Sequence, residues 1–283
     1  MSREAGARIL LCGRHRLPLD RPLVMGVINI TPDSFFEGSR VLDPKVAFAA
    51  AQRMIAEGAD LIDVGAESTR PGAQPTSEAE ELERLVPLVE KLAASNVPVS
   101  ADTRKPAVMR AAIAAGAGMI NDVSALRAPG ALEVLAGASE PVAVCLMHMQ
   151  GEPATMQRSP AYGDVVADVK GFLAERARAC ESAGIARERI VLDPGFGFGK
   201  TVEHNLALLR ALPEIAALGF PVLAGLSRKA TIGAITGREV GDRLAGSLAA
   251  ALAAVARGAA IVRVHDVRET VDALKIWNAV QNG

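Results

Sequence analysis

The chain has 283 residues, a length that suits one large α/β barrel or two ordinary domains. Half of the residues are apolar, which is enough for a large core. Its 31 basic and 32 acidic residues give a formal net charge of −1, so the overall charge provides no electrostatic case for binding nucleic acid or an anionic membrane. The three cysteines form no C-x-x-C pair, which argues against a disulfide framework or a typical zinc site and predicts buried thiols in a reducing cytoplasm.

The N-terminal segment RILLCGRHRLPL places a Gly-Arg turn between two apolar pieces and predicts a hairpin that covers the bottom of a barrel. Its apolar run, ILLC, is too short for the core of a signal peptide. The most apolar later stretch, SLAAALAAVARGAAIVRV, is interrupted by Arg257 and Arg263 and predicts a buried helix and strand, not a membrane span. We therefore expect a soluble, cytoplasmic protein.

Eight short apolar runs recur along the chain, each followed by a longer helical pattern. The runs are continuous, as in a parallel sheet covered by helices on its outer face. They cover residues 23–29, 61–67, 97–103, 119–125, 142–148, 190–196, 221–227 and 260–266. The helical patterns cover residues 45–57, 77–94, 106–115, 130–137, 164–183, 203–211, 242–257 and 267–280.

Helix boundaries are marked in the sequence. Ser77 and Glu80 form a predicted capping box, and glycines at 58, 116, 184 and 258 predict helix ends. Eight strand–helix units without a linker predict one domain over residues 1–283, an α/β fold that closes into a (β/α)8 TIM barrel. A doubly wound open sheet is the alternative.

Polar residues lie at or just beyond the end of every predicted strand, where a barrel of this kind carries its functional groups. They are Asn29, Asp63, Glu67, Asp102, Asn121, Asp122, His148, Asp193, Ser227, Arg228, Lys229, Arg263, His265 and Asp266. Each also has a structural interpretation, because a buried polar group needs a partner. Pairing within the fold is the favoured interpretation for Asp63, Glu67 and His148, whereas both interpretations stay open for Asp122 and Asp266.

The residue types suggest what this face binds. A cationic rim of Arg70, Lys229, Arg263 and His265 suits phosphate or diphosphate. Acceptors and one amide from Asp102, Asn121 and Asp193 suit a flat heterocycle with several N–H groups and a carbonyl. Asn29 offers a neutral oxygen for Mg²⁺ already carried by a diphosphate.

The stretch DPGFGFGKT, residues 193–201, is close to a phosphate-binding loop but differs from it. A P-loop requires glycine five places before Gly199, where this chain has Pro194. The alternating glycines at 195, 197 and 199 do not match G-x-G-x-x-G either.

Eight motifs resemble those of the dihydropteroate synthase family and occur in its order over roughly residues 20–280. They are MGVINITPDSF, DVGAESTRPGA, DTRKPAV, MINDVSAL, LMHMQGEPATMQ, LDPGFGFGKT, GLSRKATIG and RVHDV. The resemblance implies a transferase of folate biosynthesis, the sulfonamide target, that joins 4-aminobenzoate to 6-hydroxymethyl-7,8-dihydropterin diphosphate by an SN1-like route. It also implies Mg²⁺ as cofactor and a homodimer. From the charge balance and the absence of an uninterrupted apolar span, we expect no nucleic-acid or membrane partner.

The same resemblance implies residue roles. The pterin site would comprise Asp102, Asn121, Val123, Met147, Asp193, Phe198, Lys229 and Arg263. The diphosphate site would comprise Asn29, Thr69, Arg263 and His265, with Asn29 also holding Mg²⁺. The 4-aminobenzoate site would comprise Phe35, Thr69, Arg70, Pro71 and Lys229, from loops 30–40 and 68–76. Catalysis would fall to Asp102, Lys229, Arg263, His265 and Asn29, and Lys200 would have at most a supporting role.

Two positions depart from the family pattern. Ala230 stands where a serine often helps to hold the aminobenzoate carboxylate, and backbone N–H groups are expected to replace it. Phe36 and Glu37 stand where Ser-Asp is common in the first loop.

Two other functions remain open from the sequence. Another pterin-binding barrel, such as a corrinoid-dependent methyltransferase acting on methyltetrahydrofolate, shares the Asp and Asn contacts but not NITPDSF and ESTRPG. An inactive barrel that serves as a partner-binding module usually loses the diphosphate and loop residues, which this chain retains.

Overall fold

The computed structural model describes residues 8–30, 44–68 and 74–281, and their strands form a hairpin and a closed barrel. The barrel order is β10-β3-β4-β5-β6-β7-β8-β9, with neighbours parallel, and β10 pairs with both β9 and β3. The strands are β3 Leu23–Asn29, β4 Leu61–Gly65, β5 Val99–Asp102, β6 Met119–Asp122, β7 Ala143–Met147, β8 Ile190–Asp193, β9 Val222–Ala224 and β10 Ala259–Val264. This confirms the predicted (β/α)8 barrel and rules out the open sheet.

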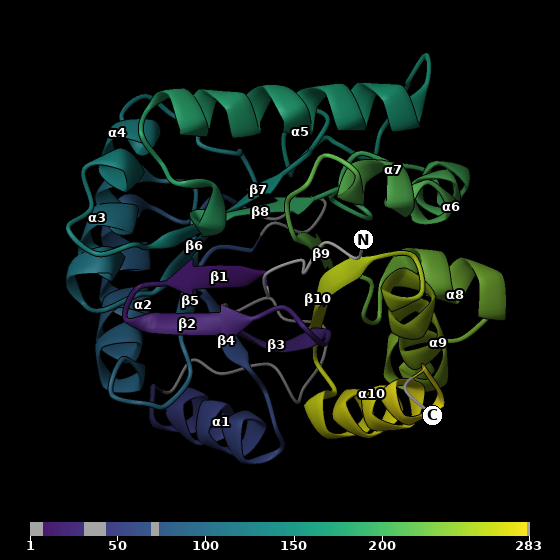
Figure 1. Cartoon of the computed structure of the whole chain (residues 1–283), viewed down its shortest axis with the longest axis horizontal. Coiled ribbons are helices and arrows are strands. Elements are labelled where there is room, and N and C mark those ends of the chain that lie inside the picture. Colours follow the sequence, from purple (N-terminus) through teal and green to yellow (C-terminus); the bar gives the residue numbers. More distant parts are fainter. Residues whose placement is uncertain (1–7, 31–43, 69–73, 282–283) are drawn as a thin grey trace, which may run out of the picture.

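Helices surround the barrel (Figure 1). They are α1 Pro44–Ala56, α2 Glu78–Leu92, α3 Pro106–Ala114, α4 Ala131–Ala136, α5 Val165–Ser182, α6 Val202–Arg210, α7 Leu212–Ala216, α8 Ala230–Thr236, α9 Leu244–Val255 and α10 Val267–Gln281, with 3₁₀ turns η2 Arg187–Arg189 and η3 Val240–Asp242. None of the described helices is both long and apolar enough to cross a bilayer.

The main differences from prediction lie at short elements and strand ends. Helices α7 and α8 have five and seven residues, too few for a recognisable helical period. Strands β4, β8 and β9 end before the apolar runs do, because Ala66, Phe196 and Leu226 stay buried in the loops beyond the last paired residue. The capping box at Ser77 is present, and the four glycines predicted to end helices all adopt positive φ.

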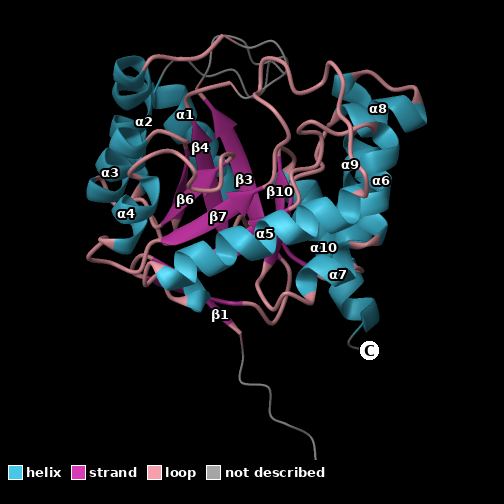
Figure 2. Ribbon diagram, turned by 90° about the horizontal axis from the view of Figure 1, so that it is seen from above, coloured by secondary structure: helices cyan, strands magenta, loops and turns pink. Residues whose placement is uncertain are grey.

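The N-terminal hairpin closes one end of the barrel, as predicted (Figures 1 and 2). Strands β1 Ile9–Cys12 and β2 His15–Pro18 are antiparallel, and Leu10 and Cys12 pack on interior side chains of the barrel strands. The fit is close at Gly118, where an added Cβ would lie 2.8 Å from the Cys12 carbonyl oxygen. All three cysteines are buried free thiols.

Candidate active site

The predicted polar residues that the structure describes gather at the end of the barrel opposite the hairpin, where the parallel strands terminate. Strand register brings them level, because Gly65 pairs with Asp102, Asp102 with Asn121, and Met147 with Asp193. Asn29 ends β3, Asp102 ends β5, Met147 ends β7 and Asp193 ends β8, while Lys229 directly precedes α8 and His265 directly follows β10.

Arg263 is the centre of a charged cluster at this end. Its Nε lies 2.6 Å from Asp63 Oδ2, and its Nη2 lies 3.0 Å from Asp102 Oδ2. Asp63 is fully buried and also accepts a hydrogen bond from Asn121 Nδ2 at 3.2 Å. Asp63 therefore has the structural role predicted for it, because it fixes Arg263 and Asn121 relative to one another. Burial by itself lowers the pKa of Arg263, but the charges of Asp63 and Asp102 raise it above its ordinary value.

Two carboxyl groups at the barrel mouth are held in surroundings that favour their neutral forms. Burial, with the negative charge of Asp63 next, raises the pKa of Asp102. Burial also raises the pKa of Asp193, although Lys229 opposes the shift. A cationic ligand placed between these groups would restore their charge, which makes the mouth receptive to positive charge on a bound ring.

The loop after β8 takes a path that requires its alternating glycines. Gly195, Gly197 and Gly199 have φ of +68°, +81° and +62°. An added Cβ would lie 1.9 Å from the His148 carbonyl oxygen at Gly195 and 2.5 Å from the Gln150 carbonyl oxygen at Gly199. The chain thus turns tightly against the end of β7 and the loop after it, and the alternating glycines make this turn possible.

An apolar wall lies beside the turn. Val123 and Met147, both predicted, cluster with Met149 and Met156, and Phe198 packs against them. Met149 was not identified from the sequence. Its position two residues after Met147, at the end of a strand, indicates that both side chains point to the same face. Met156 lies in the loop after β7, where no periodicity indicates which side chains turn inward.

Lys229 lies above this wall. Its ammonium is 4.7 Å from the centre of the Phe198 ring and donates a hydrogen bond to the Phe196 carbonyl. Burial lowers the pKa of Lys229 to about 8, against the opposing effect of Asp193. The positive charge of Arg263 also lowers the pKa of Lys229, although less than burial does.

The remaining described candidates have partners within the fold. His265 Nδ1 lies 3.0 Å from Ser227 Oγ. Asp266 forms a two-pronged ion pair with Arg228, at 2.7 and 2.9 Å, and Asp122 accepts hydrogen bonds from the backbone of Ser124 and Leu126. Asp122 and Asp266 thus have the partners within the fold that their structural interpretation requires.

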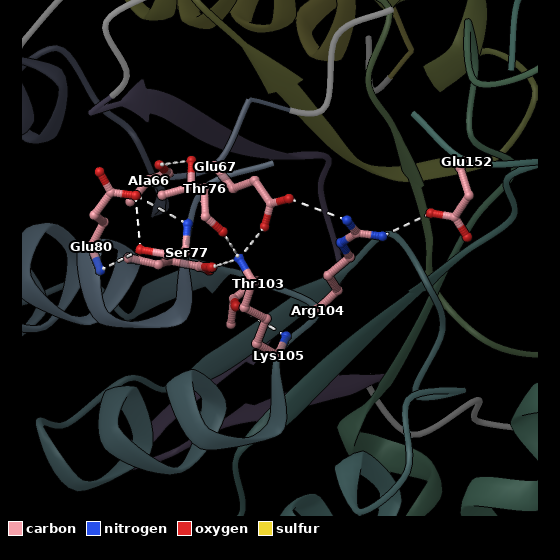
Figure 3. A network of polar contacts seen from close by, with 10 residues as sticks. Ala66, Glu67, Thr76, Ser77, Glu80, Thr103, Arg104, Lys105 and Glu152 are labelled. Atoms are coloured by element: carbon pink, nitrogen blue, oxygen red, sulfur yellow. Dashed lines mark hydrogen bonds and ion pairs between the residues drawn. The ribbon is translucent and has the colours of Figure 1, made fainter. Parts of the chain in front are cut away.

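A polar network joins the end of β4 to the start of α2 (Figure 3). Lys105 forms ion pairs with Glu67 and the fully buried Glu81, and binds the Thr76 carbonyl at 2.8 Å. Arg104 links Glu67, at 3.2 Å, to Glu152, at 2.9 Å. Glu67 is thus structural, as predicted. Phe35, Thr69, Arg70 and Pro71, with Phe36 and Glu37, lie outside the described residues.

The described residues do not suggest a resident metal site. Among them, no three His, Cys, Asp or Glu side chains are arranged to hold a metal ion. Asn29 Oδ1 and Asp102 approach Gly65 together, since a Cβ added there would lie 3.5 Å from the amide oxygen and 3.3 Å from Asp102 Cβ. One neutral oxygen beside a carboxyl group fits a cation that arrives already bound to an anionic ligand.

Comparison with known proteins agrees with this geometry. The family described as "Pterin binding enzyme" matches residues 25–265. The dihydropteroate synthase of Neisseria meningitidis serogroup B is 51% identical over 274 residues, covering 95% of this chain and 96% of that protein. The structure of Xanthomonas albilineans dihydropteroate synthase with 4-aminobenzoic acid has 54% identity and a TM-score of 0.90, and the comparison covers 97% and 98% of the two chains.

The structure of Burkholderia cenocepacia dihydropteroate synthase with 7,8-dihydropteroate has 55% identity and a TM-score of 0.88, with 98% and 97% of the two chains covered. These matches extend over nearly the whole length of each chain. The chain belongs to the dihydropteroate synthase family of pterin-binding enzymes.

Proposed function

We propose that this chain condenses 4-aminobenzoate with 6-hydroxymethyl-7,8-dihydropterin diphosphate to form 7,8-dihydropteroate and diphosphate. Relatives about half identical to it carry the synthase name, and two of the similar structures hold 4-aminobenzoic acid and 7,8-dihydropteroate. The observation that carries the proposal is the Arg263 cluster, which holds Asp102 and Asn121 at one end of the barrel beside Lys229 and Asp193.

The pterin would lie against the apolar wall and across the charged cluster. Asp102, Asn121, Asp193 and Lys229 would form hydrogen bonds with its polar edges, and the Arg263 guanidinium would stack on its ring. Val123, Met147 and Phe198, which cluster in the structure, would cover its faces. This set combines an apolar slot with a few fixed polar groups, as small-molecule sites generally do.

The reaction would begin with cleavage of the C–O bond between the pterin methylene and the diphosphate. The carboxyl groups of Asp102 and Asp193 would stabilise the cationic pterin, and Arg263, His265 and Thr69 would bind the departing diphosphate. Mg²⁺ held by Asn29 would supply further charge neutralisation on that leaving group. The aromatic amine would then form the C–N bond and lose its proton afterwards, without need of a strong base. Phe35, Thr69, Arg70, Pro71 and Lys229 would bind the aminobenzoate.

We also propose that the chain acts in the cytoplasm as one domain that forms a homodimer. Large apolar side chains are exposed on α8 and α10, at Ile235, Ile276 and Val280. These two helices flank the alanine-rich α9, and all three lie together on one side of the barrel (Figure 1). Light scattering coupled to gel filtration would report twice the chain mass of 29.4 kDa for a dimer.

The activity is tested directly with purified protein. The chain is incubated with the pterin diphosphate, Mg²⁺ and labelled 4-aminobenzoate, and dihydropteroate is separated and counted. Product formation is expected, and it should stop when Mg²⁺ is chelated. A folded protein, judged by circular dichroism, that gives no product would contradict the proposal.

A further inference from the structure

Lys200 is a buried amine bound mainly to carbonyl groups. Lys200 is only 3% exposed. Its Nζ lies 3.0 Å from the Phe198 carbonyl oxygen and 3.2 Å from the His148 carbonyl oxygen. The third contact is His148 Nδ1 at 3.0 Å. Within the described residues, none of these three partners is a carboxylate, although Asp193 exerts an attractive charge on the amine.

Burial disfavours the charged form of the Lys200 amine and lowers its pKa to about 7. Burial, followed by the charge of Lys200, lowers the pKa of His148 to about 3, which leaves the imidazole neutral and able to accept from the amine. The His148 backbone N–H donates to the Asp193 carbonyl at 3.0 Å. Lys200 therefore connects the end of β7 with the turn that follows β8.

Every carbonyl of that turn, from Gly195 to Gly199, accepts a hydrogen bond. In order, the donors are the Phe198 backbone N–H, Lys229 Nζ, Gln157 Nε2, Lys200 Nζ and Tyr162 Oη. The Gly197 N–H is bound as well, by Asn205 Oδ1 at 2.7 Å. A turn with its carbonyls held in this way has little freedom to change its path.

We propose that Lys200 and Tyr162 are positioning residues of the pterin site, which fix the turn 195–199 so that Phe198 stays beneath Lys229. Lys200 holds the Phe198 carbonyl, and the ring of the same residue lies 4.7 Å from Lys229 Nζ. Tyr162 Oη holds the next carbonyl, of Gly199, at 2.8 Å. Neither residue touches substrate in this proposal, which rests on the proposed function because it assigns the pterin to this wall.

Loss of these hydrogen bonds should affect mainly one substrate, the pterin diphosphate. The turn forms part of the pterin wall, whereas four of the five residues proposed to bind 4-aminobenzoate come from the segments that follow β3 and β4. The fifth, Lys229, contacts the turn but is held by its own place at the start of α8. Releasing the turn should therefore weaken binding of the pterin diphosphate far more than binding of 4-aminobenzoate. A residue that served only the stability of the barrel would reduce the amount of folded enzyme and would not separate the two KM values.

The first test is Lys200→Met, which keeps an unbranched chain and removes the N–H donors. We expect KM for the pterin diphosphate to rise about tenfold or more, as for loss of a buried hydrogen-bond donor that leaves its acceptors unpaired, and KM for 4-aminobenzoate to change less than twofold. Calorimetry with the pterin diphosphate alone should show the same loss of affinity. Lys170→Met is the matched control, because Lys170 lies on α5 in an exposed pair with Glu214 and should leave both KM values unchanged.

The second test is Tyr162→Phe, which keeps the ring and removes only the hydroxyl that binds Gly199. We expect the same selective rise in KM, about threefold, and less than additive effects in the double variant because both residues hold one turn. If Lys200→Met does not fold, Tyr162→Phe decides. Unchanged pterin affinity in the folded variants, or an equal rise in both KM values, would overturn the proposal. A wild-type chain that binds the pterin but forms no dihydropteroate would instead contradict the proposed function.

Discussion

Lys229 is the residue at which the charged cluster and the apolar wall meet. It contacts the Phe196 carbonyl and the face of the Phe198 ring, and Asp193 attracts its charge. Lys229→Ala removes a preorganised charge from the reacting centre, so we expect kcat/KM to fall by about 100-fold, equivalent to ~3 kcal/mol. Lys170→Ala provides the control. A loss below tenfold in steady-state assays would show that Lys229 lies outside the reacting centre.

The charge of Lys229 should also appear in the pH dependence of catalysis. Its pKa, lowered by burial to about 8 from an ordinary 10.5, means that the protonated form is lost as pH rises through 8. We expect kcat/KM, which reports the free enzyme, to decline above about pH 8 with a slope approaching tenfold per unit. Lys229→Arg retains its charge at this pH and should move the decline to higher pH. A wild-type profile that is flat to pH 10 would contradict this role.

Lys105 shows how much one buried ion pair can matter. Lys105 forms an ion pair with Glu81, which is fully buried. Among the described residues, the other carboxylate oxygen of Glu81, Oε1, has no hydrogen-bond partner. Lys105→Met should lower the free energy of unfolding by about 3–5 kcal/mol, because it leaves a buried carboxylate unpaired. The deficit should shrink at lower pH, since burial raises the pKa of Glu81 and protonation removes its charge.

Urea unfolding at two pH values measures this effect. Arg84→Met is the control, because its pair with Glu80 is exposed and should contribute less than about 1 kcal/mol. Equal losses in the two variants would show that Glu81 finds another partner.

At the scale of elements, two glycines in and after α5 show how backbone conformation, and not only free space, decides whether a Gly→Ala substitution stabilises the fold. Gly171 lies inside the helix, exposed, with no atom within 4 Å of an added Cβ. Gly171→Ala should raise the free energy of unfolding by about 0.5–1 kcal/mol. Gly184 has equally open space but a φ of +88°, so Gly184→Ala should lower stability by ~1 kcal/mol. Urea midpoints that move in the same direction for both variants would contradict this explanation.

The elements themselves were largely predictable, for a physical reason. A strand covered on both faces is mostly apolar, and most of the barrel strands have that property, with polar interruptions such as Asp63 and Asn121. The same rule explains the overrun at Phe196, which is buried but no longer paired to a neighbouring strand. Helix α7 escaped prediction because five residues do not complete a recognisable period.

The site was predictable only in part. Residues at strand ends follow from the barrel itself, which places Asp102, Asn121 and Asp193 on one face. Side chains that bind loop carbonyls do not follow in this way. Tyr162 and Gln157 reach the turn through a loop whose path is set by tertiary contacts, and the sequence carries no pattern that pairs them with Gly199 and Gly197.

At the scale of the whole molecule, the two ends of the barrel differ in role: one is packed for stability, and the other carries the charged residues of the site. The hairpin end is apolar and closed, with Leu10 and Cys12 packed on the interior of the strands. The other end concentrates Asp63, Asp102 and Arg263 in a protein whose net charge is only −1. Affinity for charged substrates therefore depends on local arrangement and not on the field of the whole chain.

This division predicts that stability and substrate binding can be changed separately. Leu10 is 1% exposed and packs on the barrel interior, so Leu10→Ala should lower the free energy of unfolding by about 2–5 kcal/mol through the cavity it leaves. Leu17, on the facing strand, is only partly buried and should lose less on substitution by Ala. Both KM values should match wild type at a temperature where the variant is folded, because Leu10 packs in a different apolar cluster from the one that contains Val123 and Met147. A KM that rises in proportion to the lost stability would show that the hairpin also shapes the site.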